Sequence, residues 1–239
     1  SRRRRAKLLA QLSRSLYFAD VDRRKAYSAE AVELARGLDA KDALLVAVRS
    51  YQFSLWEPGY ATQRCALGDE MLALATELRD ASMTAEAYTW RIVNHLELGE
   101  MAPVYDALRR YRELVAATRL PRERWRLTVI EGALALLAGR VADAERLTQR
   151  ATTLLAPSPG NNVAQFYAVQ LFFNHEMTGR MAALDPLVQA TAEQAVTLPV
   201  WDAALALLHA MVGRHDAARA LLDQLGAAGF ASLPRDGNL

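Results

Sequence analysis

Apolar residues recur at helical spacing along almost the whole chain. Runs of alternating β-branched and polar residues between turn signals, which would indicate half-buried strands, are hard to find. The pattern therefore predicts an all-α fold. The segments with helical periodicity are 3–18, 23–37, 41–56, 62–79, 81–98, 102–118, 122–138, 141–155, 162–178, 182–195, 200–212 and 214–227.

Glycines divide this pattern at a regular interval. Gly59, Gly99, Gly139 and Gly179 are spaced 40 residues apart, and Gly213 follows after 34. Each comes after an apolar helix and before a shorter amphipathic one, where glycine can adopt the left-handed conformation that ends a helix. Because repeats of this period form stacked helical hairpins, the sequence predicts an array of about six.

The repeat phase continues across the segment 156–162, which is rich in proline and glycine. We therefore expect a longer loop between repeats there and a single repeat domain over residues 1–239. Residues 230–239 look like the approach to another hairpin. Since a repeat array is expected to end in a polar capping helix, the sequence predicts a fragment of a longer chain.

The hairpin around Gly139 resembles the tetratricopeptide repeat. Gly132 lies seven residues before the turn, and Ala144 and Ala151 follow it on one face of the second helix. Small residues seven apart let a neighbouring helix approach closely. The other hairpins keep the turn and the period but replace these residues, so the resemblance implies a degenerate array with the right-handed superhelical form of that family.

Composition and charge exclude several classes of protein. Of the 239 residues, 52% are apolar and 23% charged, and 29 basic residues against 27 acidic ones give a formal charge of only +2. Such a chain is folded and has no general field for nucleic acid or anionic membrane. Cys65 is the only cysteine, which excludes an internal disulfide and a cysteine-based zinc site and fits a cytoplasmic location. No apolar stretch is long enough to cross a membrane, and we expect the basic run at residues 2–5 to be solvated.

Motifs for catalysis and for cofactors are missing. There is neither a phosphate-binding P-loop nor the nucleophile motif of hydrolases. His175-Glu176 begins like a zinc-protease helix, but Gly179 stands where the second ligand is needed. His95 and His175 share a repeat phase and are expected to be packed histidines with a hydrogen-bonded edge. The sequence predicts neither an enzyme nor a metal or cofactor site.

The first helices of the hairpins carry most of the aromatic residues. In stacked hairpins these helices line the concave side, where ligands bind. The face predicted for the groove is formed by Arg49, Phe53, Trp56, Thr89, Val93, Leu96, Arg126, Val129, Phe173 and Glu176. Its apolar character suits an amphipathic helix or an apolar ligand with one anionic group. Arg91, next to Trp90, is either an anion or cation-π site on the same groove or one half of an ion pair.

Five local signatures go beyond the generic repeat. They are Arg49-Ser50-Tyr51-Gln52-Phe53-Ser54-Leu55-Trp56-Glu57-Pro58, Trp90-Arg91 before Leu96-Glu97-Leu98-Gly99, Gln165-Phe166 with Gln170-Leu171-Phe172, Leu198-Pro199-Val200-Trp201, and Phe230-Ala231-Ser232-Leu233-Pro234-Arg235-Asp236. Their order resembles the C-terminal tetratricopeptide-like region of large actinobacterial signalling proteins. These are ATP-dependent LuxR-type, maltose-regulator-like transcription regulators and related proteins with a cyclase or AAA-type ATPase domain.

The resemblance implies a non-catalytic sensor arm in the cytoplasm. In that family an NTPase module precedes the repeats and a DNA-binding module often follows, so the expected partners are these modules, another protein or a small-molecule inducer. A homo-oligomer is possible, whereas direct contact with nucleic acid or membrane is not expected. The alternative is a free-standing scaffold that captures a helix or peptide. A helical enzyme without a known motif is the third hypothesis.

Overall fold

The computed structural model describes residues 1–16, 20–155, 163–184, 199–227, 229–230 and 233. Over these residues it contains eleven α-helices, one 3-10 helix and no strand, so the all-α prediction is confirmed. The helices follow one another as a repeat-like series. The chain divides into two compact units, Ser1–Arg119 (unit 1) and Leu120–Leu239 (unit 2).

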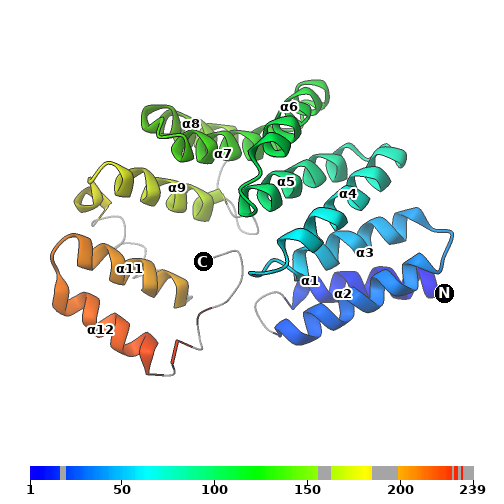
Figure 1. Cartoon of the computed structure of the whole chain (residues 1–239), viewed down its shortest axis with the longest axis horizontal. Coiled ribbons are helices and arrows are strands. Elements are labelled where there is room, and N and C mark those ends of the chain that lie inside the picture. Colours follow the sequence, from blue (N-terminus) through cyan, green and yellow to red (C-terminus); the bar gives the residue numbers. More distant parts are fainter. Residues whose placement is uncertain (17–19, 156–162, 185–198, 228, 231–232, 234–239) are drawn as a thin grey trace. The chain divides into compact units, whose positions relative to one another are not determined.

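Unit 1 is built from helices that pack in chain order (Figure 1). They are α1 (Arg2–Ser15), α2 (Val21–Arg36), α3 (Lys41–Ser54), α4 (Ala61–Glu77), α5 (Ala81–Glu97) and α6 (Met101–Thr118). Each contacts the next, and α1 also contacts α3. Consecutive helices joined by short connections run antiparallel, which gives the hairpins that the glycine spacing predicts.

Unit 2 continues the series over its described residues. Its elements are α7 (Pro121–Leu137), α8 (Val141–Leu154), α9 (Val163–Met177), the 3-10 helix η1 (Met181–Leu184), α11 (Pro199–Met211) and α12 (His215–Gly226). Helix α7 contacts both α8 and α9, and α11 contacts α12. The helix predicted over 182–195 is a 3-10 helix where it is described. Its remainder, the loop predicted at 156–162 and most of the segment after residue 230 lie outside the described residues.

The turns between paired helices depend on left-handed backbone. Gly99 and Gly139 have φ values of +74° and +71°, and Gly179 and Gly213 also have positive φ. After Gly99 the amide of Glu100 donates to the carbonyl of His95 at 2.9 Å, and after Gly139 the amide of Arg140 donates to Ala135 at 2.9 Å. These bonds satisfy carbonyl groups at the helix ends. The predicted glycine turns are therefore confirmed.

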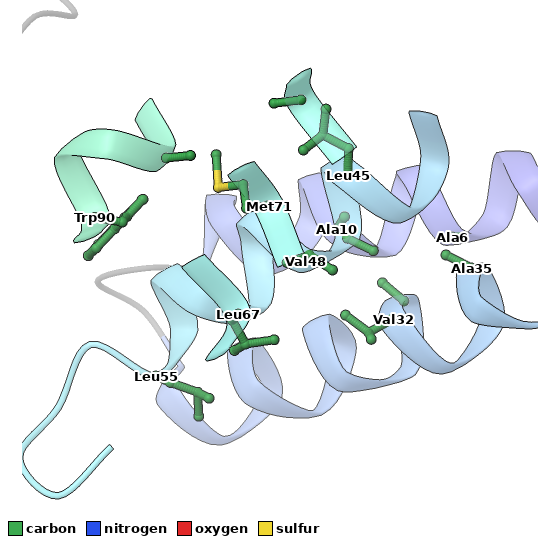
Figure 2. Close-up of a cluster of buried hydrophobic side chains, with 14 residues drawn as sticks. Ala6, Ala10, Val32, Ala35, Leu45, Val48, Leu55, Leu67, Met71 and Trp90 are labelled. Atoms are coloured by element: carbon green, nitrogen blue, oxygen red, sulfur yellow. The ribbon is translucent and has the colours of Figure 1, made fainter. Parts of the chain in front are cut away.

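The core of unit 1 consists mainly of small side chains (Figure 2). Ala10 of α1, Val32 and Ala35 of α2 and Val48 of α3 are all buried there. Because alanine and valine add little bulk, three helices can approach one another closely. In unit 2 the predicted small residues Ala144 and Ala151 are also buried.

Candidate functional site

The predicted groove residues of unit 1 come from α3, the turn after it, and α5. Phe53 and Trp56 pack around the buried ring of Trp90, with ring centroids 6.1 Å and 5.3 Å from it. Both contacts are edge-on, the arrangement that aromatic rings favour. Phe53 and Trp56 stay half-buried. The cluster is thus a packed aromatic centre with two rings that still reach solvent.

Polar residues beside this cluster are engaged within the protein. The Arg49 Nε donates to Glu86 Oε1 at 2.6 Å, and the two half-buried side chains link α3 to α5. Thr89 Oγ1 donates to the carbonyl of Ala85 at 3.1 Å. An anionic ligand at Arg49 would have to compete with Glu86 for the guanidinium.

Arg91 does not reach the aromatic cluster. Its guanidinium forms an ion pair with Asp69 of α4. The ion-pair interpretation of Arg91 is therefore confirmed, although the partner lies on the neighbouring helix and not on α5. A residue that points from α5 to α4 is a poor candidate for a ligand contact beside Phe53.

The other predicted groove residues lie in unit 2. Arg126 pairs with the buried Glu123 one turn earlier, at 3.0 Å between Nη1 and Oε2. Phe173 contacts the ring of Phe172 edge-on at 5.7 Å, and Glu176 is half-buried. The predicted groove is thus described as two separate sets of residues, one in each unit.

The largest exposed apolar surface of unit 2 is a stripe on α9. Phe166, Val169, Phe173 and Met177 are 43%, 42%, 47% and 59% exposed. Their spacings of three and four residues place them on one side of the helix. We call these four residues the α9 face. Phe166 is anchored at one end by an edge-on contact with Trp125 at 5.6 Å.

Sequence reasoning identified Phe173 but missed Val169 and Met177. Val169 lies one repeat after Val129, which was among the predicted groove residues. The 40-residue spacing could therefore have extended the face to Val169. Exposure itself was not predictable, because it depends on which neighbouring helices cover each position.

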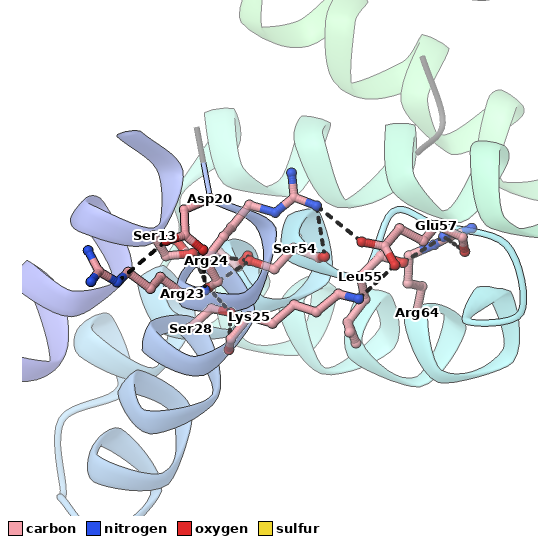
Figure 3. Close-up of polar contacts among 11 residues, drawn as sticks. Ser13, Asp20, Arg23, Arg24, Lys25, Ser28, Ser54, Leu55, Glu57 and Arg64 are labelled. Carbon is pink, nitrogen blue, oxygen red and sulfur yellow. Dashed lines mark hydrogen bonds and ion pairs between the residues drawn. The ribbon is translucent and has the colours of Figure 1, made fainter. Parts of the chain in front are cut away.

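Two buried arginines were also missed. Arg24 of α2 and Arg64 of α4 are 1% and 0% exposed and lie 40 residues apart. Arg24 Nη2 donates to the carbonyl of Ser54 at 3.4 Å and to Glu57 Oε1 at 3.3 Å (Figure 3). Lys25 Nζ donates to the other oxygen of Glu57 at 2.6 Å.

Arg64 repeats this arrangement on the next hairpin. Its Nε donates to Asn94 Oδ1 at 3.0 Å, and another nitrogen pairs with Glu97. Its Nη1 donates to the carbonyls of Leu55 and Glu57 at 2.8 Å and 3.1 Å. Asn94 and Glu97 lie 40 residues after Ser54 and Glu57. Each arginine thus links the second helix of one hairpin to the end of the first helix of the next.

Cys65, His95 and Glu100 do not form a catalytic arrangement. Cys65 Sγ lies 3.9 Å from His95 Nδ1, and the same nitrogen lies 2.7 Å from Glu100 Oε2. Because one nitrogen faces both groups, the imidazole cannot relay a proton between them. Burial is the main reason that the pKa of Cys65 is raised, the opposite of an activated thiol.

Both histidines have the hydrogen-bonded edge that was expected. His175 Nδ1 lies 2.9 Å from the carbonyl of Leu171, and His95 faces Glu100. Among the residues that the structure describes, no three histidine, cysteine, aspartate or glutamate side chains are placed to hold a metal ion. Nor does any described helix combine the length and apolarity needed to cross a bilayer.

Comparison with known proteins adds no identity to this geometry. No protein-family model matches the chain, and no curated protein matches it. The arguments on function therefore rest on the residues and contacts described above.

Proposed function

We propose that the chain is a non-catalytic binding domain whose α9 face receives a partner. In this proposal it is the sensor or interaction arm of a bacterial transcription regulator and controls NTPase and DNA-binding modules outside this segment. The hairpins form a right-handed tetratricopeptide-like superhelix of about six repeats. The series of helices with glycine turns at a 40-residue spacing supports this arrangement.

The observation that carries the proposal is the exposure of the α9 face. Four large apolar side chains lie in a row on one helix, each more than two-fifths exposed. Contiguous apolar patches on folded proteins commonly mark interaction sites. The equivalent residue of Phe173 in unit 1, Phe53, is instead packed against Trp56 and Trp90.

The chemistry around the stripe favours an amphipathic helix over an acidic small molecule. Glu176 is half-buried beside it, and Arg180 is paired with Glu145 of α8. An anion at this face would meet the Glu176 carboxylate without a free guanidinium to offset it. A partner helix with apolar residues at three- and four-residue spacing and a basic flank would match the stripe.

A sensor arm must also have two states that the partner binds unequally, since equally tight binding to both shifts nothing. The double variant Phe173→Asp, Met177→Asp tests the regulatory role in the cells that produce the protein. Because both side chains are solvent-exposed, the variant is expected to fold. We expect altered transcript levels for a defined set of genes in these cells.

The matched control is Leu78→Asp, which places the same charge on an exposed leucine of unit 1. Transcript levels in the control should equal those of the wild type. Unchanged transcription in the double variant would contradict the regulatory role. If the double variant loses a bound polypeptide without any change in transcription, the free-standing scaffold is the better interpretation.

A further inference from the structure

The outward side of α1 is a second exposed apolar surface, far from α9 in sequence. Leu8 and Leu12 are 55% and 44% exposed and lie one turn apart. They border an open depression of about 340 Å³, which is lined by Ser1, Arg4, Arg5, Leu8, Leu9 and Leu12. We call these six residues the α1 face.

The repeat shows what covers this face elsewhere. Val48 and Gln52 of α3 lie 40 residues after Leu8 and Leu12 and are fully buried. Figure 2 shows Val48 in the core with Val32 of α2, the second helix of the preceding hairpin. One repeat later, Ile92 of α5 is also buried, and α5 packs against α4. The positions that α2 and α4 cover on the following hairpins are thus uncovered on α1.

Charge narrows the chemistry of a covering helix. Helix α1 has no acidic residue but carries four consecutive arginines and Lys7. Arg3 and Lys7 both pair with Asp42, and Arg5 pairs with Glu30. Arg4 has no ion-pair partner among the described residues and lines the depression. A helix that covers the α1 face therefore gains from carboxylates near Arg4.

We propose that the α1 face docks an acidic amphipathic helix of a partner polypeptide. The apolar side of this helix packs on Leu8 and Leu12, as α2 packs on Val48. Its carboxylates lie toward Arg4, one turn before Leu8. The proposal is independent of the α9 face, because it uses other residues in the other unit.

A membrane or a nucleic acid fits the α1 face less well. Only two leucines are strongly exposed, which is little apolar surface for insertion into a bilayer. Three of the five cations in residues 2–7 are already paired with carboxylates. The two leucines also occupy the same repeat phase as Val48 and Gln52, where the protein itself packs a helix.

The test uses a peptide with the sequence of α4, residues 61–77, as the probe. This helix carries Asp69, Glu70 and Glu77 against the single cation Arg64, and it packs on α5 in the same way. A hydrocarbon staple between positions 66 and 73, both exposed in α4, keeps the peptide helical. Position 65 is serine in the peptide to prevent oxidation. Binding of the labelled peptide to the full chain is measured by fluorescence anisotropy.

We expect saturable binding that Leu8→Asp with Leu12→Asp weakens by at least about tenfold, with a smaller loss for Arg4→Glu. A charge-reversed peptide with lysine at positions 69, 70 and 77 should bind more weakly than the original. Leu78→Asp, on α4 of the protein, is the matched control and should bind like the wild type. Circular dichroism should show unchanged helix content in every variant, since all the substituted side chains are exposed.

Several results would overturn the proposal. One is no peptide binding, and another is binding that the α1 variants leave unchanged. A third is retention of the chain by anionic vesicles or by short duplex DNA that Leu8→Asp with Leu12→Asp abolishes, because the occupant would then be a lipid surface or a nucleic acid. Self-association in sedimentation that the same variant abolishes would instead identify a second copy of the chain.

Discussion

Units 1 and 2 build the same helix junction from different chemistry. Three buried positions recur 80 residues apart, as Arg64, Gly68 and Asn94 in unit 1 and as Ala144, Thr148 and Asn174 in unit 2. In both units they lie on a second helix and on the first helix of the following hairpin. The comparison shows what the repeat fixes and what it leaves free.

The first position contrasts a charged link with close packing. Arg64 reaches Asn94, Glu97 and two backbone carbonyls, whereas Ala144 fills the same place with a methyl group. A buried ion pair contributes little net stability over an apolar pair, but its loss leaves an uncompensated charge. The arginine therefore makes the junction of unit 1 more sensitive to substitution.

The other two positions contrast the treatment of one asparagine. Asn174 Nδ2 donates to the hydroxyl of Thr148 at 3.2 Å. Asn94 Nδ2 is buried and has no hydrogen-bond partner in the described part of the chain, because Gly68 stands where unit 2 has the hydroxyl. Equal phase in the repeat thus conserves the place of a side chain but not its bonding.

The largest expected effect comes from Arg64→Ala. The change removes the donor to Glu97, Asn94 and the carbonyls of Leu55 and Glu57, so the free energy of unfolding should fall by about 3–5 kcal/mol. Urea unfolding followed by circular dichroism measures it. Ala144→Ser, the control at the equivalent position of unit 2, should cost much less, and equal losses would refute the contrast between the junctions.

Gly132→Ala tests close packing in unit 2. An added Cβ would lie 3.0 Å from Gln170 Nε2, which donates to the carbonyl of Val129 at 2.7 Å. Since Gln170 cannot move without weakening this bond, we expect a net loss of about 1–2 kcal/mol in the free energy of unfolding, by the same urea measurement. A gain, as helix propensity alone would give, would show that Gln170 is free to shift.

Gly68→Ser transfers the hydroxyl of unit 2 to unit 1. We expect it to raise the free energy of unfolding by about 1 kcal/mol over Gly68→Ala, because the new hydroxyl can accept from Asn94 Nδ2. The alanine variant is the control for helix propensity, and its Cβ meets only ordinary contacts from 3.5 Å. Thermal or urea unfolding of the pair gives the difference. Equal stability of the two variants would mean that Asn94 gains nothing from the hydroxyl.

The smallest effect concerns a surface charge, as a contrast to the buried Arg64. Hydrogen bonds from Arg3 and then Lys7 lower the pKa of Asp42 from 3.8 to about 2. Because the pKa is lower in the folded state, the stability from the carboxylate is complete above about pH 4 and is lost as the pH falls through about 2. The difference in unfolding midpoint between wild type and Asp42→Asn should therefore shrink over this range. A difference that stays constant down to pH 2 would contradict the role of the carboxylate charge.

Much of the fold could be predicted from the sequence, because helical period and glycine turns are local signals. The described ends of the α-helices lie within three residues of the predicted ones, and Gly99 and Gly139 turn the chain as expected. The buried arginines could not be predicted so directly. A charged residue on an amphipathic helix usually faces solvent, and only the 40-residue match of Arg24 with Arg64 and of Glu57 with Glu97 signals the pairing.

The candidate site was predicted only in part. Phe53, Trp56 and Phe173 do lie on first helices of hairpins, but Arg49, Arg91 and Arg126 are all held by carboxylates within the protein. Ion pairing between helices depends on their packing, which the periodicity of one helix does not contain. For the same reason the exposure of Met177 was not predictable from its spacing.

Native mass spectrometry of the chain isolated from the cells that produce it tests the binding role most directly. The wild type is expected to carry a second component in simple stoichiometry, and the variant Phe173→Asp, Met177→Asp is expected to have lost it, while Leu78→Asp retains it. The mass of this component distinguishes a partner polypeptide from a small molecule. The protein mass alone in all three samples, or the same component retained by the α9 variant, would contradict binding at the α9 face.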